Sequence, residues 1–162
     1  METYLFYILA VVTVTGTILA ITEKHPVHAI VYLVTSFFGL ATIFFLLAAP
    51  LIAMFEVIIY AGAVMVLFMF VIMMLDLGRP GQAELPAFRR WLLPVLLGLI
   101  ILGSIVMLAT HRATTQGSSH VVTVREFAVT LFQKYGVAIE IISMQLLFAV
   151  VGALYLGRKR TP

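Results

Sequence analysis

The chain has 162 residues, of which 63% are hydrophobic and 10% are charged, and its formal net charge is +3. Soluble domains carry about 25% charged residues, so this chain has too few polar side chains to cover a water-soluble globule. It contains no cysteine, which excludes disulfides, thiolate-held iron–sulfur clusters and zinc-thiolate sites. The composition therefore predicts an integral membrane protein surrounded by the lipid bilayer, with no nucleic-acid partner.

Five uninterrupted apolar stretches follow one another along the chain, each close to the roughly 20 residues that cross a bilayer core. We expect an all-α fold, with a single membrane domain over residues 1–162. Transmembrane helices are predicted at residues 4–22, 27–48, 51–75, 91–110 and 136–157, with longer connections at 76–90 and 111–135. The small-residue pairs Gly16/Ala20 and Thr35/Gly39 indicate close packing between helices.

The basic residues are distributed unevenly between the two ends of these spans. One end holds Lys24, Arg79, Arg89, Arg90, Arg158, Lys159 and Arg160, and the other holds Arg112, Arg125 and Lys134. Cytoplasmic connections of membrane proteins are enriched in Lys and Arg. We therefore expect the N-terminus outside, in the periplasm, the C-terminus in the cytoplasm, a cytoplasmic connection at 76–90 and an outer connection at 111–135.

The outer connection contains an amphipathic pattern before the fifth span. Its apolar residues recur with helical spacing, at Val124, Phe127, Ala128, Leu131, Phe132 and Tyr135. This periodicity predicts a short helix lying along the membrane interface. Its role is either that of a surface anchor or that of a docking site for a partner, and the pattern does not decide between them.

Two carboxylates interrupt the apolar spans. Glu56 lies five residues into the third span and Glu140 lies four residues into the fifth. Ionisable residues inside a membrane are costly, so each is a candidate functional residue. The alternative is that each carboxylate reaches the outer interface or pairs with Arg112, Arg125 or Lys134.

The third span has further unusual features. Glu56, Tyr60 and Ala63 fall on one face of a regular α-helix, where a carboxyl and a phenol could line a proton or water path. Gly62 lowers helix propensity and favours a local irregularity such as a kink or π-bulge. The alternative is that the small residues 61–63 only allow a neighbouring helix to approach closely.

Other kinds of site find no support in the sequence. The four histidines lie at span ends and form no pair at one depth for a haem, and no phosphate-binding loop or metal-ligand cluster is evident. We therefore expect no catalytic residue, no metal site and no cofactor bound by this chain.

The segment from Glu56 to Phe68, continuing to Met73-Met74-Leu75-Asp76, resembles the third helix of the subunit J family of bacterial NADH:quinone oxidoreductase, respiratory complex I. This family is the counterpart of mitochondrial NADH dehydrogenase subunit 6. Further matches are His25-Pro26-Val27-His28-Ala29 at the second span and Tyr135, Glu140 and Ser143-Met144 around the fifth. The resemblance covers nearly the whole chain.

The resemblance implies a subunit without a redox centre in a proton-translocating enzyme of the bacterial inner membrane. NADH, FMN, iron–sulfur clusters and quinone would be bound by other subunits, and the partners would be subunits K, H and A and the antiporter-like subunit N. In the family a π-bulge near the Tyr-Ala-Gly stretch is associated with a gated water path. Carried over, the gating residues are Tyr60, Ala61, Gly62 and Val66, with Glu56 nearby and Glu140 as a secondary candidate.

The expected function is therefore the coupling of quinone reduction to proton pumping, with no catalysis by the chain alone. Three alternatives remain open. The subunit could be purely structural, it could belong to a related complex that uses a donor other than NADH, or it could be a small transporter that acts alone, although no inverted repeat supports the last.

Overall fold

The computed structural model describes residues 2–75, 88–114 and 123–158, and the regular structure in these ranges is helical throughout. The elements are α1 (Glu2–Thr22), α2 (Pro26–Leu46), α3 (Pro50–Phe55), the π-helix η1 (Glu56–Val64), α4 (Met65–Met74), α5 (Phe88–Thr114) and α6 (Val124–Gly157). Since α3, η1 and α4 form one continuous stretch, five helical stretches are long and apolar enough to cross a membrane. This confirms the predicted number of spans, whereas their orientation stays a prediction.

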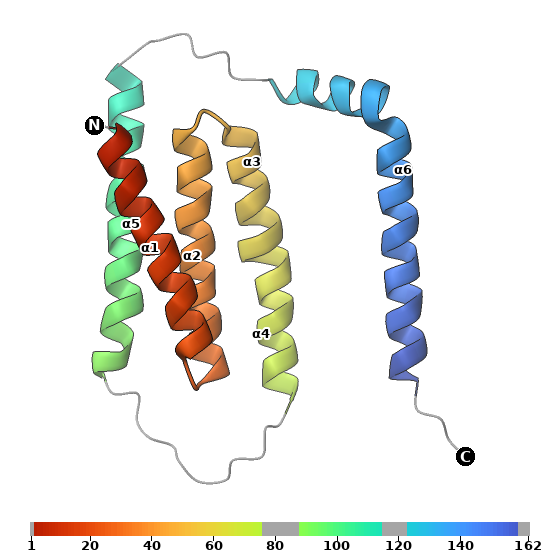
Figure 1. Cartoon of the computed structure of the whole chain (residues 1–162), viewed down its shortest axis with the longest axis horizontal. Helices are drawn as coiled ribbons and strands as arrows, with labels where there is room; N and C mark the ends of the chain where they lie inside the picture. The colour runs from red at the N-terminus through yellow and green to blue at the C-terminus, as the bar shows by residue number, and fades with distance from the viewer. Residues whose placement is uncertain (1, 76–87, 115–122, 159–162) are drawn as a thin grey trace. The chain divides into compact units, whose positions relative to one another are not determined.

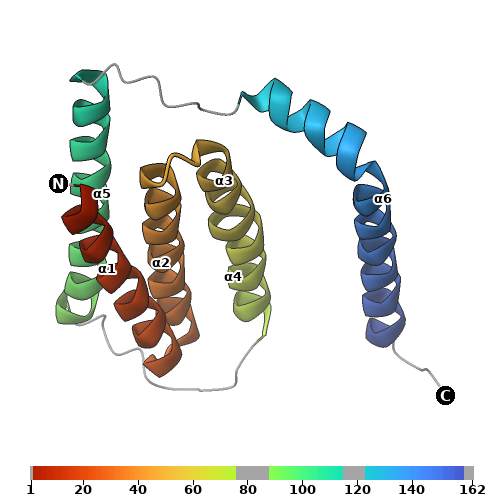
Figure 2. The ribbon, with the colours of Figure 1, turned by 45° about the horizontal axis from the view of Figure 1, so that its top comes forward.

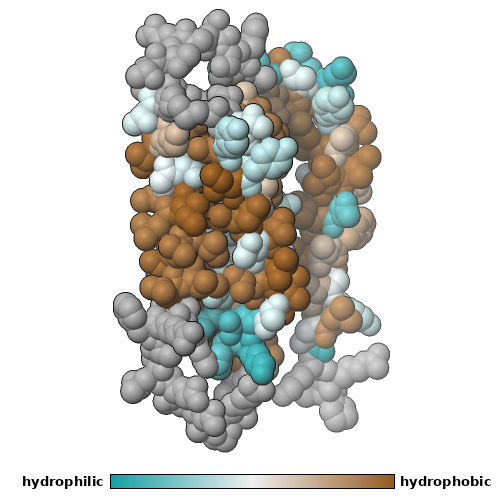
Figure 3. All heavy atoms as spheres, turned by 60° about the vertical axis from the view of Figure 1, so that its left-hand side comes forward, coloured by the Kyte–Doolittle hydropathy of each residue, from teal (hydrophilic) through white to brown (hydrophobic). Residues whose placement is uncertain are grey.

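The described residues belong to two compact units, 1–121 and 122–162. In the first unit α2 is the central helix, because it packs against α1, α5 and all three segments of the third span (Figures 1 and 2). Figure 3 views this unit from the side of α1 and α5 and shows apolar side chains over the middle of the face. Such a belt is typical of helices that face lipid.

The apolar core of the first unit joins three helices. It consists of Leu9, Val12, Tyr32, Ile43, Leu97 and Ile101, which come from α1, α2 and α5. Leu9 is completely buried. The third span contributes no residue to this cluster, so its contact with α2 forms a separate interface.

Glycines allow α1 and α2 to approach closely. A Cβ on Gly39 would lie 2.6 Å from Oγ1 of Thr13, closer than real Cβ atoms come. A Cβ on Gly16 would lie 3.4 Å from Cβ of Ser36. The predicted packing role of these two glycines is therefore confirmed, since small residues let helix backbones meet.

Hydroxyl groups add polar contacts to the same interface. Ser36 is buried, and its Oγ lies 2.8 Å from Oγ1 of Thr17 and 3.0 Å from the carbonyl oxygen of Thr13. The Oγ1 of Thr17 in turn lies 2.9 Å from the carbonyl oxygen of Thr13. These side chains thus satisfy one another across two helices, where unpaired polar groups would be costly.

The second span ends earlier than the sequence predicts. We expected the helix to continue to Ala48, but α2 ends at Leu46 and Ala48 has a positive φ of 59°. The amide of Ala49 donates to Phe44 O at 3.0 Å and that of Ala48 donates to Phe45 O at 3.3 Å. This is a Schellman motif, which usually has glycine at the position that Ala48 occupies.

The second unit is a single bent helix. Within α6, Tyr135 has non-helical backbone angles (φ −119°, ψ 19°), and the helix turns sharply at this point (Figure 1). The bend separates 124–134 from 136–157, which agrees with the predicted boundary between amphipathic segment and span. The position of the first segment at a membrane interface stays a prediction.

A capping box starts α6. The backbone amide of Thr123 donates to Oε2 of Glu126 at 3.1 Å, and the Thr123 side chain caps the first turn in return. The sequence carries this signal as Thr-x-x-Glu, a standard helix start. The cap agrees with the amphipathic pattern, whose first apolar residue is Val124.

Candidate functional site

The third span contains nine residues of π-helix, from Glu56 to Val64. At its end the amide of Met65 points to the carbonyl oxygens of Gly62 and Tyr60, three and five residues earlier, whereas an α-helix joins residues four apart. π-helical turns are rare and occur frequently at functional sites. The irregularity predicted around Gly62 is thus present in the structure.

Gly62 lies in this segment with its backbone close to the preceding π turn. A Cβ on Gly62 would lie 3.2 Å from the carbonyl oxygen of Val57. This distance is tighter than most Cβ contacts, so a larger residue would require a shift of a few tenths of an ångström. Glycine therefore suits the π conformation better than a residue with a side chain does.

The π-helix changes which residues share a face. We predicted that Glu56, Tyr60 and Ala63 lie together, but Tyr60 and Ala63 are exposed while Glu56 is buried. The residue buried with Glu56 is Ala61, five positions later. The prediction was wrong for Ala63, because it assumed α-helical periodicity and a π-helix has more residues in each turn.

Glu56 is buried to all but 8% of its surface, on the segment that packs against α2. It forms no hydrogen bond or ion pair with any residue that the structure describes. Carboxylates inside a membrane usually find a charged, polar or hydrated partner. Since no described side-chain oxygen is fully buried without a hydrogen-bond partner, the carboxyl oxygens of Glu56 remain accessible to water or to a neighbouring subunit.

Tyr60 contacts the central helix α2 through its ring. The ring centroids of Tyr60 and Phe37 lie 5.7 Å apart at an interplanar angle of 46°. Tyr60 is nevertheless 49% exposed. One edge of the Tyr60 ring thus packs against Phe37, and the rest of the side chain is accessible from outside the chain.

Val66, the last of the predicted gating residues, lies just past the π-helix and is exposed. Of the five residues proposed from the third span, the structure buries Glu56 and Ala61 and exposes Tyr60 and Val66, with Gly62 half-buried. They lie on one continuous segment but on different faces of it.

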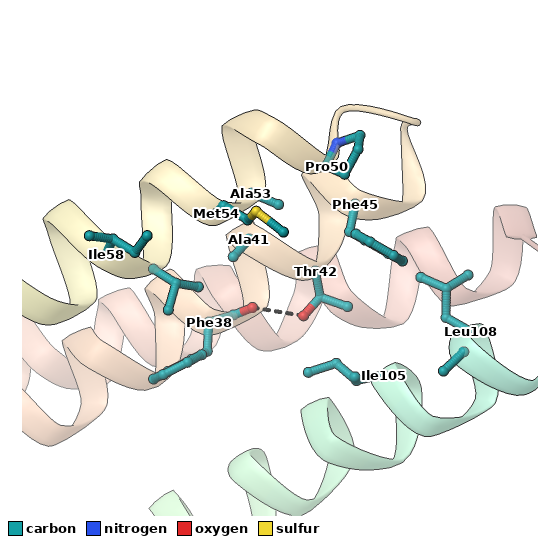
Figure 4. Close-up of a pocket in the computed structure, with 12 residues that line it drawn as sticks. Phe38, Ala41, Thr42, Phe45, Pro50, Ala53, Met54, Ile58, Ile105 and Leu108 are labelled. Atoms are coloured by element: carbon teal, nitrogen blue, oxygen red, sulfur yellow. Dashed lines mark hydrogen bonds between the residues drawn. The ribbon is translucent and has the colours of Figure 1, made fainter. Parts of the chain in front are cut away.

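An apolar cavity of about 390 Å³ adjoins the third span between α2 and α5. Figure 4 shows Met54 and Ile58 facing it from the third span and Ile105 and Leu108 facing it from α5. The hydroxyl of Thr42 at its wall donates to Phe38 O at 2.8 Å. The side chains of the lining therefore offer no free hydrogen-bond donor, and Glu56 does not line the cavity.

Glu140, the secondary candidate, lies on α6 five residues after the bend and is exposed. It belongs to the second unit, whereas Glu56 belongs to the first. Among the described residues no group of three or more His, Cys, Asp or Glu side chains could hold a metal ion. The candidate site is accordingly confined to η1 and its neighbours.

Comparisons with known proteins extend over nearly the whole chain. Residues 16–156 match the model of the family NADH-ubiquinone/plastoquinone oxidoreductase chain 6. The chain is 37% identical to NADH-quinone oxidoreductase subunit J of Pseudomonas aeruginosa, with 96% of each protein covered. It is 38% identical to subunit J of Escherichia coli K12, covering 96% of this chain and 86% of that protein, and 32% identical to that of Buchnera aphidicola from Schizaphis graminum, covering 97% and 98%. The chain therefore belongs to the NADH-ubiquinone/plastoquinone oxidoreductase chain 6 family.

Proposed function

We propose that this chain is a multi-pass membrane subunit of NADH:quinone oxidoreductase in the bacterial inner membrane, and that its third span gates a water path for protons. The observation that carries the proposal is the π-helix of η1, which holds the buried Glu56 without a partner among the described residues. The subunit J relatives support the choice of enzyme.

The gate is a change in helix type. A π-helix has wider turns and poorer packing than an α-helix, and it persists only where the surroundings favour it. Conversion of η1 to an α-helix would move Ala61 away from the face that it shares with Glu56 and would rotate the segment beyond η1 relative to Glu56. Water would reach the carboxyl group in one state and be excluded in the other.

The remaining chemistry belongs to other subunits. NADH, FMN, iron–sulfur clusters and quinone are bound elsewhere in the complex, and this chain contributes no redox centre. Its partners are subunits K, H and A and the antiporter-like subunit N, which supply most of the acidic proton carriers. Glu56 takes part as a nearby carboxylate, and Tyr60, Ala61, Gly62 and Val66 form the moving segment.

The test is to replace Gly62 with valine, which places a branched side chain against the Val57 carbonyl oxygen. We expect the assembled complex to lose both quinone reductase activity and proton pumping in membranes. The matched control is Gly103→Val on α5, where a Cβ would meet nothing within 4 Å. Undiminished pumping by an assembled Gly62→Val enzyme would rule out the gate.

A purely structural role is the second candidate, because the Tyr60 ring packs against Phe37. Glu56→Gln and Tyr60→Phe separate the two roles, since both keep the shape of the side chain. A structural subunit would tolerate both substitutions with normal pumping. Under the gating proposal, at least Glu56→Gln lowers pumping while the amount of assembled complex stays unchanged.

A further inference from the structure

The second unit presents a polar stripe on the part of α6 that is long and apolar enough to span the membrane. Gly136, Glu140 and Ser143 lie at spacings of four and three residues, within about 60° of one another around the helix. Considered by itself this unit is one helix, so none of its residues is buried. The stripe therefore requires a partner from outside the unit.

The stripe offers hydrogen-bond acceptors and no donor. The hydroxyl of Ser143 donates its single proton to the carbonyl oxygen of Ile139 at 3.0 Å, which leaves only its lone pairs. An ionised Glu140 is also an acceptor only, and it forms no hydrogen bond or ion pair with any described residue. Charge complementarity thus calls for a cationic donor, and Lys and Arg supply several donors each.

The apolar parts of this chain's spans contain no basic residue of the Lys or Arg type. Four of the candidate spans, residues 3–22, 26–46, 50–74 and 92–110, contain no Lys or Arg, and neither does the part of the fifth that follows the bend, residues 136–157. Arg125 and Lys134 precede the bend on the same helix, and the ammonium of Lys134 lies 6.0 Å from the centre of the Tyr135 ring. Arg112 lies two residues beyond the range 92–110, so all ten Lys and Arg residues of the chain lie outside these five apolar ranges.

The depth of the stripe argues against a lipid amine. Glu140 lies about 7.5 Å along the axis from the bend, and Ser143 lies about 12 Å from it, at 1.5 Å per residue. Lipid headgroup amines remain at the interface, whereas the stripe continues towards the apolar interior. Gly136 has no side chain on the same face, so a neighbouring helix can approach the Glu140 carboxylate closely.

We propose that the face formed by Gly136, Glu140 and Ser143 binds a transmembrane helix of another subunit that places a Lys or Arg against Glu140. This inference goes beyond the gate at η1 and rests on the proposed function only in requiring that the chain is assembled with other subunits. It assigns Glu140 to assembly, in place of the proton path.

The test uses the absence of cysteine from the chain, because any introduced cysteine is unique in it. Ser143→Cys carries a benzophenone maleimide in the whole complex, and Leu147→Cys on the same face replaces it should the first variant fail to assemble. The matched control is Ile141→Cys, about 3 Å away along the axis but about 200° around the helix from Ser143. After illumination, adducts that contain this chain are isolated and the linked peptides are sequenced.

We expect a strong adduct between residue 143 and a transmembrane segment of another subunit, with a Lys or Arg within two turns of the linked residue, and a weaker adduct from residue 141. Glu140→Lys should reduce the share of the chain retained in the complex several-fold, and replacing the basic residue with Glu should restore it. An adduct within the chain, an adduct with lipid alone, or a partner segment without a basic residue would overturn the proposal. Failure of the chain to migrate with any complex would contradict the proposed function as well, whereas a complex without an adduct from the stripe refutes this inference alone.

Discussion

The carbonyl oxygen of Val57 lies 3.2 Å from the position that a Cβ on Gly62 would take. The two residues are five positions apart, which is the spacing that a π turn brings together. A side chain at position 62 would therefore press against the π turn. Substitutions of increasing size at this position test whether η1 has to remain a π-helix.

Substitutions at Gly62 should impair the enzyme in the order of side-chain size. Gly62→Ala requires the Val57 carbonyl to shift by a few tenths of an ångström, so we expect pumping to fall by less than half. Gly62→Val adds two further methyl groups compared with alanine and should remove most of the pumping. Proton uptake by vesicles, divided by the amount of assembled complex, measures the effect, and equal values for the two variants would contradict this account.

Gly39→Ala should disrupt the contact between α1 and α2. The new methyl group would lie 2.6 Å from Thr13 Oγ1, and overpacking of this kind lowers the free energy of unfolding by about 1–3 kcal/mol. Thermal denaturation of the solubilised complex measures this loss of stability. Thr13→Ala removes the clashing oxygen, which bonds only to Leu9 O of its own helix.

The double variant Gly39→Ala/Thr13→Ala should therefore regain most of the lost stability. Gly98→Ala on α5 is the control, because a Cβ there meets nothing within 4 Å. Equal destabilisation by Gly39→Ala and Gly98→Ala would mean that close approach at Gly39 is unimportant.

Ser36→Ala tests the hydroxyl contacts between α1 and α2. Interhelical hydrogen bonds in membranes contribute about 0.6–1.7 kcal/mol. We expect the lower part of this range, because Thr17 keeps its contact with Thr13 O at 2.9 Å when Ser36 Oγ is lost. Thr15→Ala is the control, since its exposed hydroxyl bonds only to Val11 O in its own helix. Identical denaturation temperatures for the two variants would contradict an interhelical role.

Ala48→Gly should stabilise the protein. An L-residue in the left-handed conformation costs about 1–2 kcal/mol, and Ala48 has a φ of 59°. Part of the gain is offset by the greater freedom of glycine in the unfolded chain, so we expect about 0.5–1 kcal/mol. Ala49, whose φ is −112°, should lose stability on the same substitution. A lower denaturation temperature for Ala48→Gly would contradict the assigned turn.

Hydropathy predicts the number of spans because each one is long and apolar in its own right. The change from amphipathic to apolar pattern likewise predicts the bend of α6 at Tyr135. These features depend on sequence that is local to each element, which is why they could be read directly.

The end of α2 and the face of Glu56 could not be read in this way. Ala48 adopts a conformation that sequence assigns to glycine, so the turn is fixed by the hydrogen bonds around it. The grouping of Glu56 with Ala61 depends on a π-helix, and apolar periodicity assumes about 3.6 residues per turn. Gly62 favours an irregularity there but does not specify its extent.

The extra residue that η1 accommodates has a geometric consequence for α4. An α-helix advances about 1.5 Å and turns about 100° with each residue. A return of η1 to α-helical bonding would therefore move the C-terminal half of the third span as a screw, rotating the Met65–Met74 segment about its own axis while shifting it slightly along that axis. Since Pro50 follows the Schellman turn directly, the N-terminal end of the span is held by that turn, and the Met65–Met74 segment would carry the movement.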